Sequence, residues 1–196
     1  NTASQYAKNM SDEHKKALFK YTKDSSALNS SLRSGKVTHP AHKKQIEHID
    51  KSFIESPHDI EVRHGVRNGE HIKHLNSLMH SPDTNSHTLK SPAYISTTTN
   101  SAIAEKFSDD AVHKDPDGVT HILRIHVKKG HKIAPLGHLS NYSGGGHGTS
   151  NEHEVLLHRE SSIKIHNTPE IREFKGINGK EKYKKKIAYW HAELEQ

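Results

Sequence analysis

The apolar residues of this chain occur in short runs, and the longest of these runs alternates in the manner of a β-strand. Val119–Val127 alternates apolar and polar side chains and follows a turn at Asp115–Gly118. Val155–Leu157 is a shorter apolar run that follows polar residues. Because such runs need a partner surface to bury, they predict a folded core that contains β-sheet and argue against a disordered chain.

The N-terminal part of the chain carries helix signals instead. Ser11 suits a helix cap before His14–Tyr21, and a proline can open a helix over Ala41–Ile54. The intervening Tyr21–Val37 is rich in serine, so a loop with a helical turn is expected there. We therefore predict a helical N-terminal segment over residues 1–58.

Residues 59–196 show many short elements separated by turn residues. Strands are expected at residues 60–66, 93–99, 120–127, 132–136, 162–165 and 187–194, and helices at residues 69–79 and 101–107. Ser81–Ser91 is expected to be a polar loop, and the last strand could also be drawn as a helix over Lys180–Glu195. Helices followed by many short strands predict an α+β domain with antiparallel sheets.

Composition limits the classes of function. The 196 residues include no cysteine, which excludes disulfides, thiolate catalysis and cysteine-based zinc sites. Hydrophobic residues make up 30% of the chain. No segment approaches the roughly 20 apolar residues of a membrane span, so no membrane partner is expected.

The chain is basic, with a net charge of +6 and a pI of about 9.3. Such a balance favours acidic partners, among them nucleic acid, an acidic protein surface or a phosphorylated ligand. Lysines gather at Lys128–Lys129 and within Lys180–Lys186, where a solvated face is the simpler interpretation. The 20 histidines add positive charge as the pH falls below about 6.5.

Two acidic residues stand directly before the second apolar run. Asn151-Glu152-His153-Glu154 leads into Val155, and a glycine-rich loop, Asn141–Ser150, precedes it. Side chains two residues apart on a strand share a face, so Glu152 and Glu154 are expected to point into one site. On spacing alone such a pair is usually a solvated face, but as a site it suits a positively charged transition state.

Two further motifs precede the acidic pair. Arg63 lies on a predicted strand just before Gly65, and Ser96-Thr97-Thr98 lies on another. In this order the three motifs resemble the R-S-E class of mono-ADP-ribosyltransferases, in particular its arginine-type, bacterial toxin-like members, over Ile60–Ile165. The resemblance implies an ADP-ribosyltransferase fold, which is α+β with two packed, mostly antiparallel sheets and N-terminal helices. The catalytic core would then be residues 59–196.

The resemblance also implies a reaction, in which NAD⁺ is a substrate and no metal takes part. Loss of nicotinamide leaves an oxocarbenium-like ribose, whose charge Glu154 would stabilise while Ser96 holds that carboxylate in position. Glu152 and Tyr142 would contact the acceptor. In the family, Glu-x-Glu rather than Gln-x-Glu goes with arginine acceptors, because a carboxylate can orient and polarise a guanidinium.

The residues implied to bind NAD⁺ come from all three motifs and from the helix after the second. Arg63 would hold the phosphates or the adjacent ribose through its planar donor fork, and Thr98 would brace the nicotinamide end. Phe107 is either a ring that stacks on nicotinamide or a core residue. The implied binding set is Arg63, His64, Gly65, Ser96, Thr97, Thr98, Phe107 and Glu154, and the implied catalytic set is Arg63, Ser96, Glu152 and Glu154.

The chain departs from the family pattern in three places: at His64, at Thr98, which replaces the last serine of a Ser-Thr-Ser triplet and keeps a hydroxyl, and in the loop before Glu152, which is longer in glycine than usual. His64 separates the arginine from the glycine, where the family often has the two side by side. Arg67 is a second arginine, but its Asn-Gly surroundings indicate a turn. His71 and His74 would share a helix face without a third ligand, so a solvated face is expected rather than a metal site.

The favoured function is a toxin or effector domain that transfers ADP-ribose from NAD⁺ to an arginine of a target protein. Such a domain is secreted or delivered into a target cell and acts in its cytoplasm, and an immunity protein is a further expected class of partner. An RNA acceptor and a non-enzymatic basic binding module are the alternatives. A glycosidase built on Glu152 and Glu154 would leave the upstream motifs without a purpose.

Overall fold

Four helices precede the first strand in the computed structural model, which describes residues 2–80, 87–109, 118–139, 153–166, 168–178 and 181–196. The helices are α1 (Thr2–Lys8), α2 (Asp12–Lys23), α3 (Ser26–Arg33), α4 (Pro40–Asp50), α5 (Gly69–His80) and α6 (Ser101–Asp109), with a 3-10 turn, η1, at Gly137–Leu139. The strands are β1 (Ile54–Glu55), β2 (Ile60–Gly65), β3 (His87–Lys90), β4 (Ile95–Thr98), β5 (Val119–Val127), β6 (Lys132–Pro135), β7 (Glu154–Leu157), β8 (Ser162–Ile165), β9 (Glu170–Asn178) and β10 (Glu181–Glu195). No described helix has both the length and the apolar character of a membrane span.

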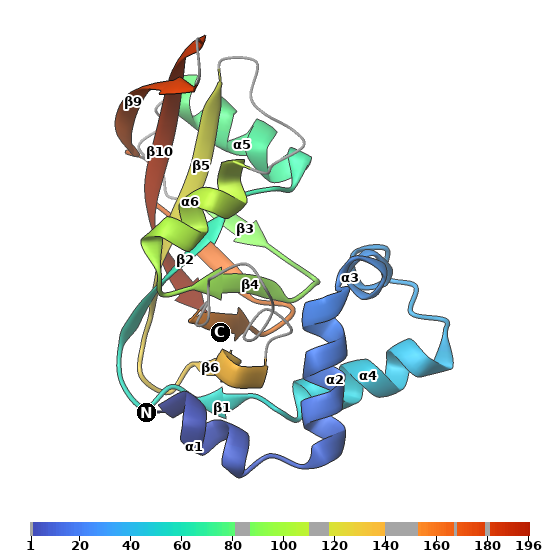
Figure 1. Ribbon diagram of the computed structural model, residues 1–196. Coiled ribbons are helices and arrows are strands. Elements are labelled where there is room, and N and C mark those ends of the chain that lie inside the picture. The colour runs from blue at the N-terminus through green and yellow to red at the C-terminus, as the bar shows by residue number, and fades with distance from the viewer. Residues whose placement is uncertain (1, 81–86, 110–117, 140–152, 167, 179–180) are drawn as a thin grey trace.

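The strands form one hydrogen-bonded path in the order β1-β6-β7-β4-β2-β5-β10-β8-β3, and β9 pairs with β10 beside it. Neighbouring strands are antiparallel except β5 and β10, which are parallel. In Figure 1, β5 and β10 run upright while β4 lies across them. The path therefore has two halves, β1-β6-β7-β4 and β2-β5-β10-β8-β3. They join between β2 and β4 through a single registered pair, Arg63 with Thr98.

The strand β7 is covered on both faces. One apolar cluster combines Val155 and Leu157 of β7 with residues of β2, β5, β8, β10 and α5. Leu156, which points the other way, packs in a second cluster with α1, α2, α3 and α4. Burial on both faces explains why the sequence shows an uninterrupted apolar run there rather than an alternating one. The predicted α+β class, with mostly antiparallel strands and N-terminal helices, is confirmed.

Two local predictions were wrong. The serine-rich Tyr21–Val37 contains α3, which buries Leu28 and Leu32 one turn apart. The predicted loop Ser81–Ser91 contains β3, an edge strand that pairs with β8. The prediction of a strand near the C-terminus is confirmed over a longer range, because β10 has partners on both sides and a helix there would leave them without a ladder.

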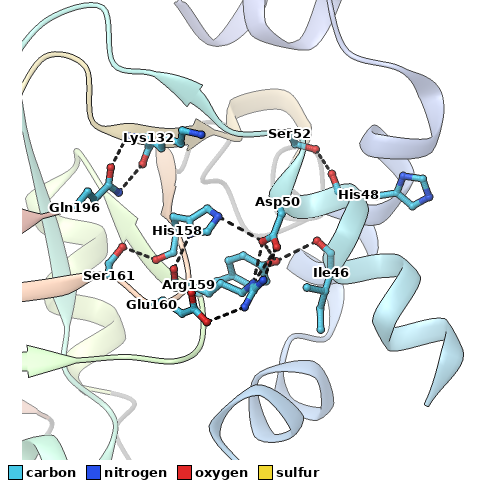
Figure 2. Close-up of polar contacts among 11 residues, drawn as sticks. Ile46, His48, Asp50, Ser52, Lys132, His158, Arg159, Glu160, Ser161 and Gln196 are labelled. Atoms are coloured by element: carbon cyan, nitrogen blue, oxygen red, sulfur yellow. Dashed lines mark hydrogen bonds and ion pairs between the residues drawn. The ribbon is translucent and has the colours of Figure 1, made fainter. Parts of the chain in front are cut away.

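A polar cluster, here named the Asp50 clamp, ties the N-terminal helices to the sheet (Figure 2). It consists of Asp50 at the end of α4, Tyr94 before β4, and His158 and Arg159 after β7. Arg159 donates to Asp50 Oδ2 from Nε at 2.9 Å and from Nη2 at 2.8 Å, and the Tyr94 hydroxyl donates to Oδ1 at 2.6 Å. The clamp fixes α4 against the strand that carries the Ser-Thr-Thr motif.

Candidate functional site

Three adjacent strands place the three sequence motifs in one row. Arg63 of β2 is in register with Thr98 of β4, and Thr98 is in register with Glu154 of β7. Registered residues of antiparallel strands point to the same face, and Ser96, two residues before Thr98, shares that face. Side chains that are far apart in sequence therefore meet where the two halves of the sheet join.

A cavity of about 180 Å³ lies over this row, between the sheet, α2 and α6. Seven of its lining residues were predicted to bind NAD⁺, and they are Arg63, His64, Gly65, Ser96, Thr97, Thr98 and Glu154. The others are Tyr21, Thr22 and Ser25 from the N-terminal helical segment, Arg67 after β2, and Ala104 of α6. The N-terminal segment thus supplies one wall of the cavity and the sheet supplies its floor.

A second cavity of about 280 Å³ adjoins the first, since Ser25, His64, Arg67 and Ser96 line both. It reaches under α3 and α5, where Arg33 is a further lining residue. Two guanidinium groups from different elements therefore face one continuous hollow. Such a hollow suits an anionic group such as a phosphate, because guanidinium matches phosphate oxygens in charge and geometry.

His64 stands between the two cavities in a defined protonation state. Its Nδ1 lies 2.8 Å from the Ser96 carbonyl oxygen, which can only accept, so Nδ1 carries the proton. Burial lowers the pKa of the ring to about 4, and the charges of His71, Arg67 and Arg33 act in the same direction. At neutral pH the imidazole is therefore uncharged, and it ties β2 to β4 where their backbones share a single pair.

The backbone at the start of β7 is shaped by hydrogen bonds on both sides. Glu154 accepts from the Leu136 N–H through its carbonyl at 2.9 Å, and Thr97 donates through Oγ1 to the Val155 carbonyl at 2.5 Å. His153 has a φ of 45°, so the extended backbone begins only at Glu154. Glu152 lies outside the described residues, so its position beside Glu154 stays a prediction.

Tyr142 and the glycine loop Asn141–Ser150 lie outside the described residues, as does the side chain of Phe107. Within the described part of the chain, no group of three or more His, Asp or Glu side chains could hold a metal ion. His71 lines the second cavity, whereas the His74 ring packs on His87 with centroids 5.5 Å apart.

No sequence motif marks the individual residues that the N-terminal segment contributes to the site. Tyr21, at the end of the predicted helix His14–Tyr21, carries no motif, and Ser25 and Arg33 lie in the serine-rich segment where a loop with a helical turn is predicted. The spacing of Leu28 and Leu32 was the one signal for α3, and it would have placed Arg33 at the helix end. Arg67 was set aside because of its turn-like surroundings, yet it lines both cavities.

The two cavities together can hold an extended ligand, and each cavity favours a different charge on the part of the ligand that it holds. The arginines attract negative groups in the second cavity, and the Glu154 carboxylate favours positive charge in the first. Hydroxyl groups of Ser96 and Thr98 can fix the ligand or the carboxylate between them. A ligand with phosphates and a centre that becomes cationic during reaction would meet both requirements.

Comparisons with known proteins agree with these features. A family model described as ADP-ribosyltransferase exoenzyme matches residues 1–189. Plx2a, an ADP-ribosyltransferase toxin from Paenibacillus larvae, is similar in structure with a TM-score of 0.68 and 19% identity, over 99% of this chain and 91% of that one. The Clostridium limosum C3 exoenzyme gives a TM-score of 0.65 and 22% identity, over 99% and 89%.

A third similar structure belongs to a longer protein. The enzymatic component C2-I of the C2 toxin from Clostridium botulinum has a TM-score of 0.62 and 20% identity, over 98% of this chain and 45% of that one. A search of curated protein sequences found no match. The structural likeness shows a shared fold, and the family match over most of the chain shows the family.

Proposed function

We propose, from the premise that this chain belongs to the ADP-ribosyltransferase exoenzyme family, that it transfers ADP-ribose from NAD⁺ to an arginine of a target protein. The family takes ADP-ribose from NAD⁺ and is toxin-like; the arginine acceptor is our inference. The observation that carries the proposal is the row of Arg63, Thr98 and Glu154 on the floor of a cavity that the N-terminal helices cover.

The proposed role of Glu154 follows from charge. When the bond between nicotinamide and ribose breaks, positive charge develops on the sugar, and an adjacent carboxylate lowers the energy of that transition state. Glu154 faces the first cavity from the edge of β7, where its backbone is fixed by Leu136. Ser96, on the same face of the sheet, would hold the carboxylate, and Thr98 would brace the nicotinamide end.

The proposed binding of NAD⁺ uses more arginines than the sequence suggested. Arg63, whose Nη2 is 3.2 Å from Glu61 Oε1, would contact the phosphates or the nearer ribose. Arg67 and Arg33 in the second cavity would neutralise the pyrophosphate. His64 and Gly65 would shape the junction between the two halves of the ligand, and Phe107 would stack on nicotinamide.

We propose that the chain has two parts, a helical N-terminal segment of residues 1–58 and a catalytic core of residues 59–196. The first part would act as a wall of the NAD⁺ site within a single domain, because Tyr21, Ser25 and Arg33 line the cavities against strands of the second part. Delivery into a target cell, action in its cytoplasm and an immunity partner remain proposals based on the toxin-like family.

The arginine acceptor rests on Glu152. A carboxylate at this position can orient a guanidinium, which is why Glu-x-Glu is taken to favour arginine over other acceptors. Tyr142 would contact the same acceptor. RNA is the alternative acceptor, since the basic charge of the chain would also attract a polyanion.

The test uses labelled NAD⁺ and a cell extract. Label that resists ribonuclease, is lost to protease and maps to arginine by mass spectrometry supports the proposal. Glu152→Gln is the matched variant, and we expect it to keep NAD⁺ hydrolysis while losing transfer. Label that ribonuclease removes, or modification on glutamine, asparagine or threonine, would contradict the arginine assignment.

A further inference from the structure

We propose that Tyr21 of α2 is a positioning residue, whose hydroxyl proton is directed at Ser96 and so holds the Ser96–Glu154 pair in its reactive arrangement. The inference rests on the proposed function and adds a residue that no sequence motif marks. It also gives the N-terminal helical segment a part in the chemistry as well as in binding.

Tyr21 is built into the protein rather than lying loosely over the site. Its side chain is 1% exposed, and its ring meets the ring of Tyr94 edge-on with centroids 5.5 Å apart. It nevertheless lines the first cavity together with Ser96 and Glu154. A buried aromatic ring with its polar end at a cavity places one hydroxyl group there with little freedom to move.

The direction of the hydrogen bonds follows from the donors present. Asn29 Nδ2, itself in a buried side chain, donates to the Tyr21 hydroxyl oxygen at 2.9 Å. An amide nitrogen cannot accept, so the proton of Tyr21 must go to another group. Ser96 and Glu154 line the first cavity together with Tyr21, and both act on the pKa of its hydroxyl, so Ser96 is the acceptor that we assign to the Tyr21 proton.

The inferred hydrogen-bonded chain of side chains runs from Asn29 through Tyr21 to Ser96. A serine hydroxyl that accepts one hydrogen bond has its own proton available for a carboxylate, here Glu154. Burial raises the pKa of Tyr21, so the phenol keeps its proton throughout the neutral range. A donor arranged in this way favours the ionised form of the carboxylate, which is the form that the reaction needs.

Charged and titratable groups from the neighbouring elements also face this point. They are Arg33 of α3, Arg63 and His64 of β2, and Arg67 after β2. None of them is altered in the variants below, so a change in the pH profile reports on the hydrogen-bonded chain.

The experiment measures nicotinamide release from NAD⁺ by the full chain across pH. Tyr21→Phe removes the hydroxyl and keeps the ring. We expect kcat to fall about tenfold with KM for NAD⁺ unchanged within about twofold, since the lost interaction acts in the transition state. The acidic limb of the kcat profile should move up by about one pH unit.

Tyr6→Phe is the matched control. Tyr6 is also buried, and its hydroxyl donates to the Ser52 carbonyl at 2.7 Å, away from both cavities. It should lower the melting temperature without moving the pH profile. A Tyr21→Phe protein that behaves like Tyr6→Phe, or that raises KM alone, would overturn the inference.

Asn29→Asp tests the direction of the hydrogen bonds in the Asn29–Tyr21–Ser96 chain. It also provides the test of the inference if Tyr21→Phe does not fold. The carboxylate would accept the Tyr21 proton and draw it away from Ser96, so kcat should fall as in Tyr21→Phe. The double variant should be no slower than Tyr21→Phe alone, and additive losses would count against a shared chain. Equal rates for wild type and Glu154→Gln would instead overturn the proposed function itself.

Discussion

The Asp50 clamp and the row of Arg63, Thr98 and Glu154 are both polar clusters that join distant parts of the chain, but they differ in what their charges face. In the clamp, Asp50 receives hydrogen bonds from Arg159 and Tyr94, and His158 Nε2 lies 3.6 Å away. In the row, a carboxylate and an arginine face a cavity of about 180 Å³.

The difference separates a polar cluster that holds the fold from one that can act on a ligand. A carboxylate whose oxygens already accept from an arginine fork and a phenol has little capacity left for a substrate. A carboxylate at the rim of a cavity can respond to charge that appears there during reaction. The two clusters should therefore respond in opposite ways to the same chemical change, from carboxylate to amide.

The largest effect is expected for Glu154→Gln. Loss of the negative charge beside the reacting sugar should lower the rate of nicotinamide release about 10²–10³-fold. The melting temperature should change little, since the shape of the side chain is kept. Equal rates for the variant and the wild type would show that the Glu154 carboxylate does not stabilise the transition state.

Asp50→Asn should show the reverse pattern. Arg159 would keep its position but lose its charged partner, and the free energy of unfolding should fall by about 2 kcal/mol. For a chain of 196 residues this corresponds to a melting temperature lower by about 4–8 °C. Assays run well below the transition should give nearly the wild-type kcat. A large loss of kcat in a folded Asp50→Asn protein would show that the clamp also serves the chemistry.

Arg33→Ala and Arg67→Ala test whether the arginines that line the second cavity bind the phosphates of NAD⁺. Each removes one cation from the second cavity, so KM for NAD⁺ should rise about tenfold with a smaller change in kcat. The effect should shrink at high salt, which screens attraction to phosphate. Arg172→Ala is the control, because Arg172 pairs with Glu170 on β9, away from the cavities, and its loss should leave KM unchanged.

The smallest expected effect concerns pH and stability at His64. Its pKa is lowered from 6.5 to about 4 in the folded chain, so below pH 6.5 the unfolded chain binds a proton that the folded chain does not. The stabilisation by neutral His64 is therefore fully present above pH 6.5 and is lost as the pH falls towards 4. The free energy of unfolding should decrease by about 1 kcal/mol between pH 7 and pH 5.5. Comparing melting temperatures of wild type and His64→Asn across this window would check it. The variant should lose less than the wild type, and parallel curves would contradict the assignment.

Prediction from sequence succeeded where local signals were strong. Ser11 accepts from the His14 N–H at 3.3 Å as the predicted cap of α2, and Asn100 accepts from the Ala102 N–H at 3.0 Å before α6. The alternation within Val119–Val127 corresponds to β5. In each case the decisive residues lie within a few positions of one another, and local propensity acts over that range.

Prediction failed where an element depends on distant partners. α3 has only eight residues, too few to be stable alone, and it forms because Leu28 and Leu32 are buried by other parts of the chain. β3 is likewise a short edge strand defined by β8. For the same reason no local signal marks Tyr21 and Arg33 as residues of the site.

The sequence alone determined the α+β class, the order of the three motifs and the chemical types of Arg63, Ser96 and Glu154. It did so because periodicity, turn residues and side-chain chemistry are written locally. Only the tertiary structure decided which of these residues meet, through the single pair that joins the two halves of the sheet. It also decided that Tyr21 and Asn29 line the same cavities as Ser96, since hydrogen bonding and burial between distant segments depend on the packing of the whole chain.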